Sequence, residues 1–145
     1  MPHIGWDNGT RNKPTHVQVR YGEVDRMGLL YHVNYYEYFE WARSDWIRNF
    51  WRPYKEIEDD GYALVVIEGH IHYHSPAYYD DRLEVTMDVI DWGRSRIRFS
   101  YAICREGESE PLCTGSTSHC FIRDGKPVRL PDEFVKLLDK AFSIL

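Results

Sequence analysis

The sequence predicts an α+β fold in which one antiparallel sheet covers one long helix. Residues 34–50 repeat apolar side chains at steps of three and four, which is typical of an amphipathic helix. Several other segments alternate apolar and polar side chains, as strands with one buried face do. Short turns join the late strands, so these strands are expected to pair as antiparallel neighbours. The buried face of such a sheet needs a partner, and the aromatic face of the helix provides it.

The elements follow one another without a repeat or an internal linker. Residues 15–145 are therefore expected to form a single domain, preceded by a flexible arm over residues 1–14. Asn34 with Glu37 three residues later resembles a capping box at the start of the helix, and Pro53 ends that segment. Strands are expected at 15–21, 62–74, 82–92, 96–104 and 112–122, and a second amphipathic helix at 130–145.

Composition and charge narrow the classes of function. The net charge of -5 argues against a nucleic-acid partner, because the phosphate backbone favours a basic surface. No apolar run approaches the ~18 residues of a membrane span, and the first residues do not resemble a signal peptide. The odd set Cys104, Cys113 and Cys120 has no CxxC pair, which fits core positions in a reducing compartment and argues against a disulfide framework. A cytoplasmic location is therefore expected.

The loop ahead of the long helix holds the strongest candidate for chemistry. It contains Asp25 and Gly28 and ends at a helix N-terminus. One interpretation of Asp25 is structural, because aspartate often stabilises turns. The other is catalytic: free N–H groups at a helix start can stabilise an oxyanion, and a carboxylate opposite them can act as nucleophile or general base. The rings nearby would form an apolar pocket with polar tips: Tyr31, Tyr35, Tyr36 and Tyr38.

The stretch "VRYGEVDRMGLLYHVNYYEYFEWARSDW" is similar to the opening motif of the hotdog-fold thioesterases. The similarity is greatest to the 4-hydroxybenzoyl-CoA thioesterase branch, which includes bacterial acyl-CoA thioesterases. The motif is met at Glu23, Asp25, Gly28, Tyr31, His32, Asn34 and Tyr35, with Arg20 one residue nearer to Glu23 than in that pattern. The resemblance continues at "YHSPAYYDDRLEV", "WGRSRIRFSY" and "GSTSHCFIRDGKPVRLP", and covers about residues 16–133.

The resemblance implies a five-stranded antiparallel sheet wrapped around a long central helix, with a short C-terminal helix. It implies a homodimer, often paired into a tetramer, with its sites at the subunit interface. It makes Asp25 the catalytic carboxylate and the backbone N–H of His32 the oxyanion donor, while the His32 side chain could equally be a capping or packing group. Gly28 and Tyr31 would shape the catalytic loop, and Glu23 would be a structural ion-pair partner. Asn34, Tyr35 and Tyr38 would line the substrate site.

Two further clusters have a structural and a functional interpretation each. The first, His70, His72 and His74, shares one strand face, where the three residues face solvent, contact another subunit or, less readily, bind a metal. Steps of about 6.6 Å between alternate strand residues are too long for three ligands of one ion, so no metal is expected. The second, Arg94, Arg96 and Arg98, forms either a solvated face or, with Ser95, a basic stripe for coenzyme A phosphates. Rival phosphate ligands are Arg82, Arg123, Lys126 and Arg129.

These observations lead to three hypotheses. The first is an acyl-CoA thioesterase that releases a carboxylic acid and coenzyme A, with no cofactor beyond the coenzyme A of the substrate. The second is a thioesterase or a non-hydrolytic binding protein for acyl or polyketide chains on an acyl-carrier protein, in a biosynthetic pathway. The third is a metal-binding protein that uses the three histidines.

Overall fold

A computed structural model of the chain describes residues 13–142 and has the expected α+β architecture. A single-turn 3₁₀ helix, Tyr21–Glu23, precedes the long helix. The helices are α1 (Asn34–Phe50), α2 (Tyr54–Asp59) and α3 (Asp132–Ala141). The strands are β1 (Thr15–Gln18), β2 (Tyr62–Tyr73), β3 (Arg82–Trp92), β4 (Arg96–Arg105), β5 (Pro111–Arg123) and β6 (Lys126–Pro127).

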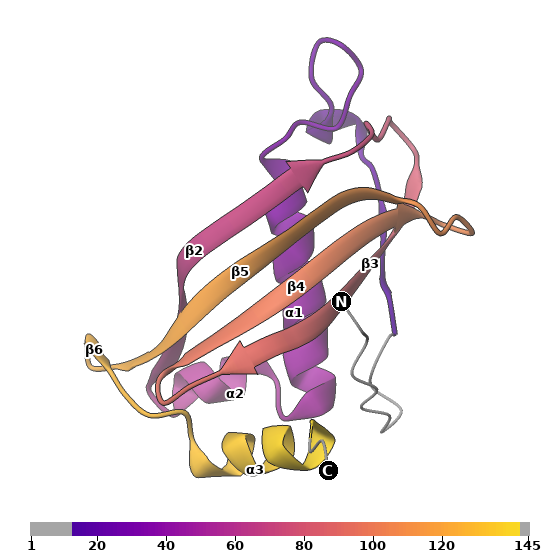
Figure 1. The fold of residues 1–145 in the computed structure, drawn as a ribbon. Coiled ribbons are helices and arrows are strands. Elements are labelled where there is room, and N and C mark those ends of the chain that lie inside the picture. The colour runs from indigo at the N-terminus through magenta and orange to yellow at the C-terminus, as the bar shows by residue number, and fades with distance from the viewer. Residues whose placement is uncertain (1–12, 143–145) are drawn as a thin grey trace.

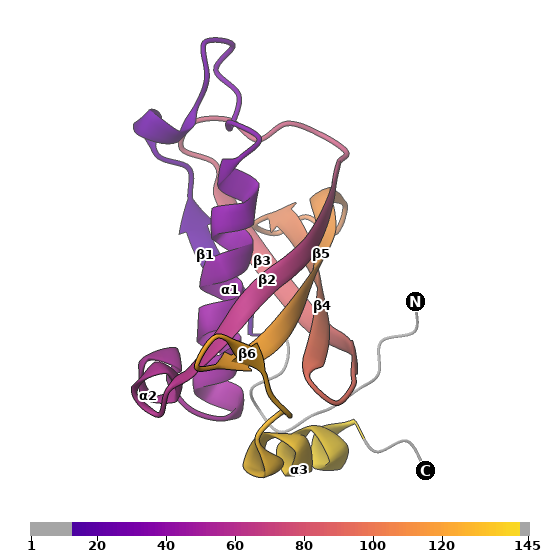
Figure 2. The ribbon, with the colours of Figure 1, turned by 90° about the vertical axis from the view of Figure 1, so that its left-hand side faces the viewer.

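All strand pairs are antiparallel, and the sheet order is β1-β3-β4-β5-β2, with β6 paired to β5. The sheet curls and crosses α1 obliquely, while α3 lies below the lower end of α1 (Figures 1 and 2). The five strands expected from the sequence are therefore confirmed, as are the central helix and the C-terminal helix.

Alternation along the strands directs one row of side chains toward α1. On β3 and β4 the buried side chains of this row are Leu83, Val85, Met87 and Val89, and Ile97, Phe99, Tyr101 and Ile103. The opposing helix buries Tyr35, Tyr38, Phe39, Ala42, Trp46, Ile47 and Phe50. Ring contacts join the two layers: Phe39 stacks on Tyr101 at a centroid distance of 4.3 Å, and Trp46 meets Phe99 edge-on at 5.2 Å.

Gly115 on β5 allows α1 to approach the sheet closely. A Cβ atom at this position would lie 2.7 Å from the carbonyl oxygen of His70 and 2.7 Å from the ring of Phe39. Only a residue without a side chain fits between the helix and the neighbouring strand there.

Several local expectations were wrong at the helix and strand ends. Asn34 is the first residue of α1, but no side chain caps the helix, so the expected capping box with Glu37 does not form. The first strand ends at Gln18 instead of residue 21. Pro53 ends the long helix as expected, yet it also starts α2, which the sequence did not reveal. β6 was missed as well, and the expected arm over residues 1–14 lies outside the described residues except for Lys13 and Pro14.

β1 and β2 form the two edges of the sheet. The β2 edge is the more exposed, because Val65, Val66 and Ile67 retain 39%, 50% and 45% of their accessible surface. α3 does not cover this edge; its buried Phe134 instead packs against Trp51 at the base of α1, with a centroid distance of 4.8 Å. The described residues thus leave the apolar β2 edge open.

Candidate active site

A small hairpin, residues 24–30, projects beyond the N-terminal end of α1 (Figure 1). It contains Asp25. The backbone N–H of Asp25 donates to the Leu29 carbonyl at 2.8 Å, and the Gly28 N–H donates to the Asp25 carbonyl at 3.0 Å. Gly28 has a φ of 79°, a left-handed conformation that glycine adopts without strain. A bridge between Leu29 and Tyr78 attaches the hairpin to the segment that follows β2.

The two carboxylate oxygens of Asp25 have different surroundings. Oδ1 accepts backbone N–H bonds from Met27 at 2.8 Å and from Leu29 at 3.2 Å, which is the turn-stabilising role. Within the described residues Oδ2 has no hydrogen-bond partner, and the side chain is exposed. One oxygen therefore holds the loop while the other is accessible to a substrate.

Asp25 opens onto a cavity of about 340 Å³ at the start of α1. The cavity is lined by Asp25, Leu29, Leu30, His32, Tyr35, Tyr73, His74, Ser75 and Pro76. The hydroxyl of Tyr73 donates to the carbonyl oxygen of His32 at 2.8 Å and so attaches the loop to the end of β2. The backbone N–H of His32 donates to no acceptor among residues 13–142. The residues that line this cavity near the helix start thus include Asp25, which has a free carboxylate oxygen, and His32, which has an unbonded N–H.

Glu23 connects the Asp25 loop to α1 by hydrogen bonds. Its Oε1 accepts the Arg20 N–H at 2.8 Å and the Tyr38 hydroxyl at 3.0 Å, and its carbonyl oxygen accepts Nδ2 of Asn34 at 2.9 Å. Burial, together with the hydrogen bond to Glu23, raises the pKa of Tyr38 far above its usual value. Glu23 therefore holds the loop through hydrogen bonds, and residues 13–142 supply no cation for the expected ion pair.

The tyrosines predicted to form the pocket differ in their positions. Tyr35 lines the cavity and packs edge-on against Tyr73 at a centroid distance of 5.0 Å, and burial raises the pKa of both hydroxyls. Tyr31 is exposed and its ring lies 4.5 Å from the ring of His32. Tyr38, by contrast, is completely buried and lies outside the cavity lining.

Comparison with known proteins assigns the chain to a family. Residues 19–138 match the thioesterase-like superfamily. The chain belongs to this thioesterase-like superfamily.

Solved structures that are similar to this chain share its hotdog fold. A hypothetical protein from Aquifex aeolicus superposes with a TM-score of 0.81 at 31% identity, over 86% of this chain and 98% of that one. A DHNA-CoA thioesterase from Staphylococcus aureus superposes with a TM-score of 0.80 at 32% identity, over 90% and 87%. The acyl-CoA thioesterase YbgC of Haemophilus influenzae is 30% identical over 119 residues, 81% of this chain and 87% of that protein. The chain is therefore a hotdog-fold thioesterase, a hydrolase of thioesters.

The sequence did not single out Tyr73, Ser75 and Pro76, which line the cavity of this thioesterase, and it marked His74 only as one of three histidines on a strand. Residues 73–76 lie 48 to 51 positions after Asp25 in the sequence and reach the loop only because β2 ends beside it. The family resemblance of the segment "YHSPAYYDDRLEV" was the only sequence signal that pointed to these residues.

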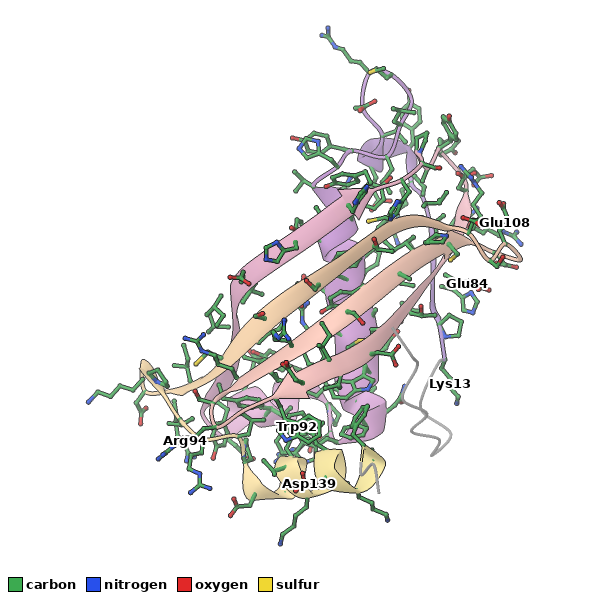
Figure 3. All side chains as sticks on the ribbon, in the orientation of Figure 1. Lys13, Glu84, Trp92, Arg94, Glu108 and Asp139 are labelled. Carbon is green, nitrogen blue, oxygen red and sulfur yellow. The ribbon has the colours of Figure 1, made fainter. Side chains whose placement is uncertain are left out.

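The stripe of Arg94, Ser95 and Arg96 proposed for coenzyme A lies at the end of the molecule opposite the Asp25 hairpin (Figure 3). Arg94 is in the β3–β4 turn, beside α3 and far from the Asp25 hairpin (Figure 3). Ser95 follows it, and Arg96 lines an open groove on the outer face of the sheet. Arg98 is held by a bidentate bond to Asp91, which lowers the pKa of that carboxyl.

His70 and His72 on β2 and His74 directly after it are exposed, and His74 also lines the Asp25 cavity. His70 contacts Glu68 at 3.2 Å, and the rings of His72 and His74 stack at a centroid distance of 4.2 Å. Within residues 13–142, no group of three His, Cys, Asp or Glu side chains is placed to hold a metal ion. The same part of the thioesterase has no helix that is long and apolar enough to span a membrane.

Proposed function

We propose that this thioesterase hydrolyses acyl-CoA to a free carboxylic acid and coenzyme A. The observation that carries the proposal is the cavity in which Oδ2 of Asp25 and the backbone N–H of His32 are both unbonded. Two relatives support the choice of carrier, because the Staphylococcus and Haemophilus proteins are named as CoA thioesterases.

The proposed mechanism divides the chemistry between the loop and the helix. The thioester carbonyl lies with its oxygen toward the N–H of His32, where the partial positive charge of the α1 start stabilises the developing oxyanion. Asp25 attacks the carbonyl carbon, the coenzyme A thiolate leaves, and water then hydrolyses the resulting mixed anhydride to release the acid. Alternatively, Asp25 takes a proton from a water that attacks the carbonyl carbon, and this proton passes to the leaving thiolate. The hydrogen bonds to Oδ1 keep the carboxylate oriented, so that Oδ2 faces the substrate.

Asp25→Asn tests this mechanism with little change to the loop, because the amide oxygen can still accept the two backbone bonds. We expect folding and acyl-CoA binding to persist while kcat falls by about a hundredfold or more, as the loss of a general base or nucleophile predicts. Asp139→Asn on the exposed face of α3 is the matched control and should leave kcat unchanged. An Asp25→Asn enzyme with near wild-type turnover would rule the mechanism out.

A panel of substrates should show whether the acyl carrier is coenzyme A or an acyl-carrier protein. The panel would contain acyl-CoA and the same acyl groups on an acyl-carrier protein, and the release of free thiol would be measured. Hydrolysis of the carrier-protein thioesters alone would favour the biosynthetic alternative, and tight binding without thiol release would favour a non-hydrolytic role.

We further propose that two subunits pair through their β2 edges and that this dimer works in the cytoplasm. The open edge supports the pairing, since its apolar residues and unpaired backbone groups suit a second strand. Antiparallel pairing would bring the Arg94 end of one subunit toward the Asp25 end of the other, where Arg94, Ser95 and Arg96 could contact coenzyme A phosphates. The free cysteines support a reducing compartment.

Light scattering after size exclusion tests the pairing. The wild-type protein should elute as a dimer or a tetramer. Val65→Lys with Ile67→Lys should give a folded monomer with much lower activity, because charges on the edge oppose strand addition. Tyr79→Lys, which adds a charge at an exposed ring elsewhere, is the control. A wild-type monomer with full activity would contradict the proposal.

A further inference from the structure

A second cavity lies between α1 and the first half of β2, apart from the Asp25 cavity. It measures about 150 Å³, which is close to the volume that holds one benzene ring. It is lined by Glu40, Arg43, Ser44, Ile47, Tyr54, Leu64 and Val66. Apolar walls and several polar groups thus meet in a space that suits the end of a small organic group.

Arg43 is the unusual member of this lining. Its side chain is half-buried on α1, and Nη1 donates to the hydroxyl of Tyr101 at 3.1 Å. No carboxylate of the described residues lies within ion-pairing distance of its guanidinium, although Glu40 lines the exposed side of the same cavity. A guanidinium has five N–H donors, so most of the donors of Arg43 have no protein acceptor in this region.

Tyr54, which also lines this cavity, supplies a second donor. The hydroxyl oxygen of Tyr54 accepts the backbone N–H of Leu64 at 2.9 Å, which leaves the hydroxyl proton to donate elsewhere. Tyr54 and Arg43 come from different helices, so the cavity has donors on two walls. An oxygen of a bound ligand would satisfy both.

The groups behind Arg43 do not neutralise its charge. The hydroxyl of Tyr101 lies 2.6 Å from the Thr117 hydroxyl, which lies 2.8 Å from Nε2 of His119. Burial raises the pKa of Tyr101, so this hydroxyl stays protonated. Burial and the nearby Arg43 charge lower the pKa of His119 to about 3, so this imidazole stays neutral. Arg43 therefore keeps a positive charge without a buried negative partner, the setting in which an anionic ligand binds well.

We propose that this cavity binds the far end of the acyl group and selects acyl chains that end in a carboxylate. Arg43 and Tyr54 donate to the carboxylate oxygens, while Ile47, Leu64 and Val66 contact the carbon atoms before it. This specificity rests on the proposed acyl-CoA hydrolysis. The substrate class is a dicarboxylic acid joined to coenzyme A through one of its two carboxyl groups.

The two cavities can share one substrate across the proposed dimer. Within one chain, nine residues of helical rise separate Arg43 from Asn34 at the start of α1, about 14 Å at 1.5 Å per residue. The Asp25 cavity adjoins Tyr73 at the end of β2, whereas the Arg43 cavity adjoins Leu64 near its start. Antiparallel pairing of two β2 edges sets the end of one strand beside the start of the other. In such a dimer the Arg43 cavity of one subunit would lie nearer to the Asp25 cavity of its partner than to the Asp25 cavity of its own chain.

Matched substrates of equal chain length test the specificity. For the wild-type enzyme we expect hexanedioyl-CoA, or a homologue in a series of four to ten carbons, to exceed the corresponding alkanoyl-CoA in kcat/KM. Arg43→Met should reduce this preference by about ten- to a hundredfold, as the loss of hydrogen bonds from a charged group predicts, and leave alkanoyl-CoA hydrolysis nearly unchanged. Arg43→Lys keeps the charge without the planar fork and should retain part of the preference.

Two control variants act on the same helix. Arg48→Met removes an exposed arginine and should keep the wild-type preference, whereas Glu40→Gln removes a negative charge from the cavity and should increase it. A wild-type enzyme with no preference at any chain length would overturn the proposal. So would an Arg43→Met enzyme that loses both substrate classes equally, because that result indicates a purely structural role.

Free acids separate this proposal from the proposed function. Hexanedioate and hexanoate would be titrated into the wild-type protein and Arg43→Met, with NMR shifts of Thr117 and Tyr101 as the readout. We expect hexanedioate alone to shift these signals, and only in the wild type. If no acyl-CoA were hydrolysed but this pattern appeared, the proposed function would fail and the binding site would stand. Equal shifts from both acids, or no shift from either acid, would rule out the proposed carboxylate-binding site.

Discussion

Burial of His119 predicts a specific loss of stability in mild acid. The side chain has no exposed surface, and its pKa is lowered to about 3 by burial and by the charge of Arg43. In the unfolded chain the same imidazole has a pKa of about 6.5. Between these values the unfolded chain binds a proton that the folded protein does not bind, so unfolding becomes more favourable as the pH falls below about 6.5.

The size of this effect follows from the two pKa values. Each pH unit below the unfolded pKa is worth about 1.4 kcal/mol, so at pH 5 the folded state loses about 2 kcal/mol relative to pH 7.5. That is a large share of a typical stability of about 5–15 kcal/mol. The loss would continue to increase until the pH approaches about 3, where the folded protein also binds the proton.

Urea unfolding at pH 7.5 and pH 5.0, at one protein concentration, measures this loss. His119→Gln keeps a neutral polar side chain but cannot bind the proton, so its free energy of unfolding should fall by about 2 kcal/mol less than that of the wild type between the two pH values. His16→Gln, which replaces an exposed histidine, should behave like the wild type. Carboxylates titrate in all three proteins, and their contributions cancel in the comparison. Equal losses in the wild type and His119→Gln would refute the reasoning.

Two further predictions concern packing and the loop. Gly115→Ala should destabilise the protein by about 1–3 kcal/mol, because the new methyl group would lie 2.7 Å from both α1 and β2, whereas Gly93→Ala, with open space around it, should have little effect on urea unfolding. Equal midpoints for the two variants would show that the helix can move away. Tyr38→Phe removes the hydroxyl that bonds the Glu23 carboxylate and should lower stability by about 1.5–3 kcal/mol and reduce kcat. Tyr36→Phe changes an exposed ring of the same helix, and a similar loss there would contradict this role for Tyr38.

The long regular elements could be predicted because their signals are local. Residues 34–50 and 82–92 form α1 and β3 with the predicted bounds, since each segment repeats one period over several turns or alternations. α2 buries only Ile57, and β6 spans two residues, so neither contains enough sequence to show a period. The capping prediction failed for a related reason: the Asn34 side chain donates to Glu23 of the loop, a partner that helix patterns do not include.

The candidate site was predictable only where its residues lie close together in the chain. Asp25, Gly28 and His32 occupy one loop, and the sequence shows both the loop and the helix start that follows it. Tyr38 was assigned to the substrate site because of its place on the aromatic helix, yet that face turns inward to Glu23. Tyr73 reaches His32 through the path of β2, which no local pattern reports.

The sequence by itself determined the order of elements, the acid ahead of a helix start and the inward face of each strand. These features depend on neighbours within a few residues, where backbone geometry fixes the period. Only the tertiary structure decided which groups meet across the core. His119 and Thr117 were visible as alternate residues of one strand, but Arg43 and Tyr101 reach them from α1 and β4. Such contacts depend on strand register and helix placement, and the packing of the whole core sets both.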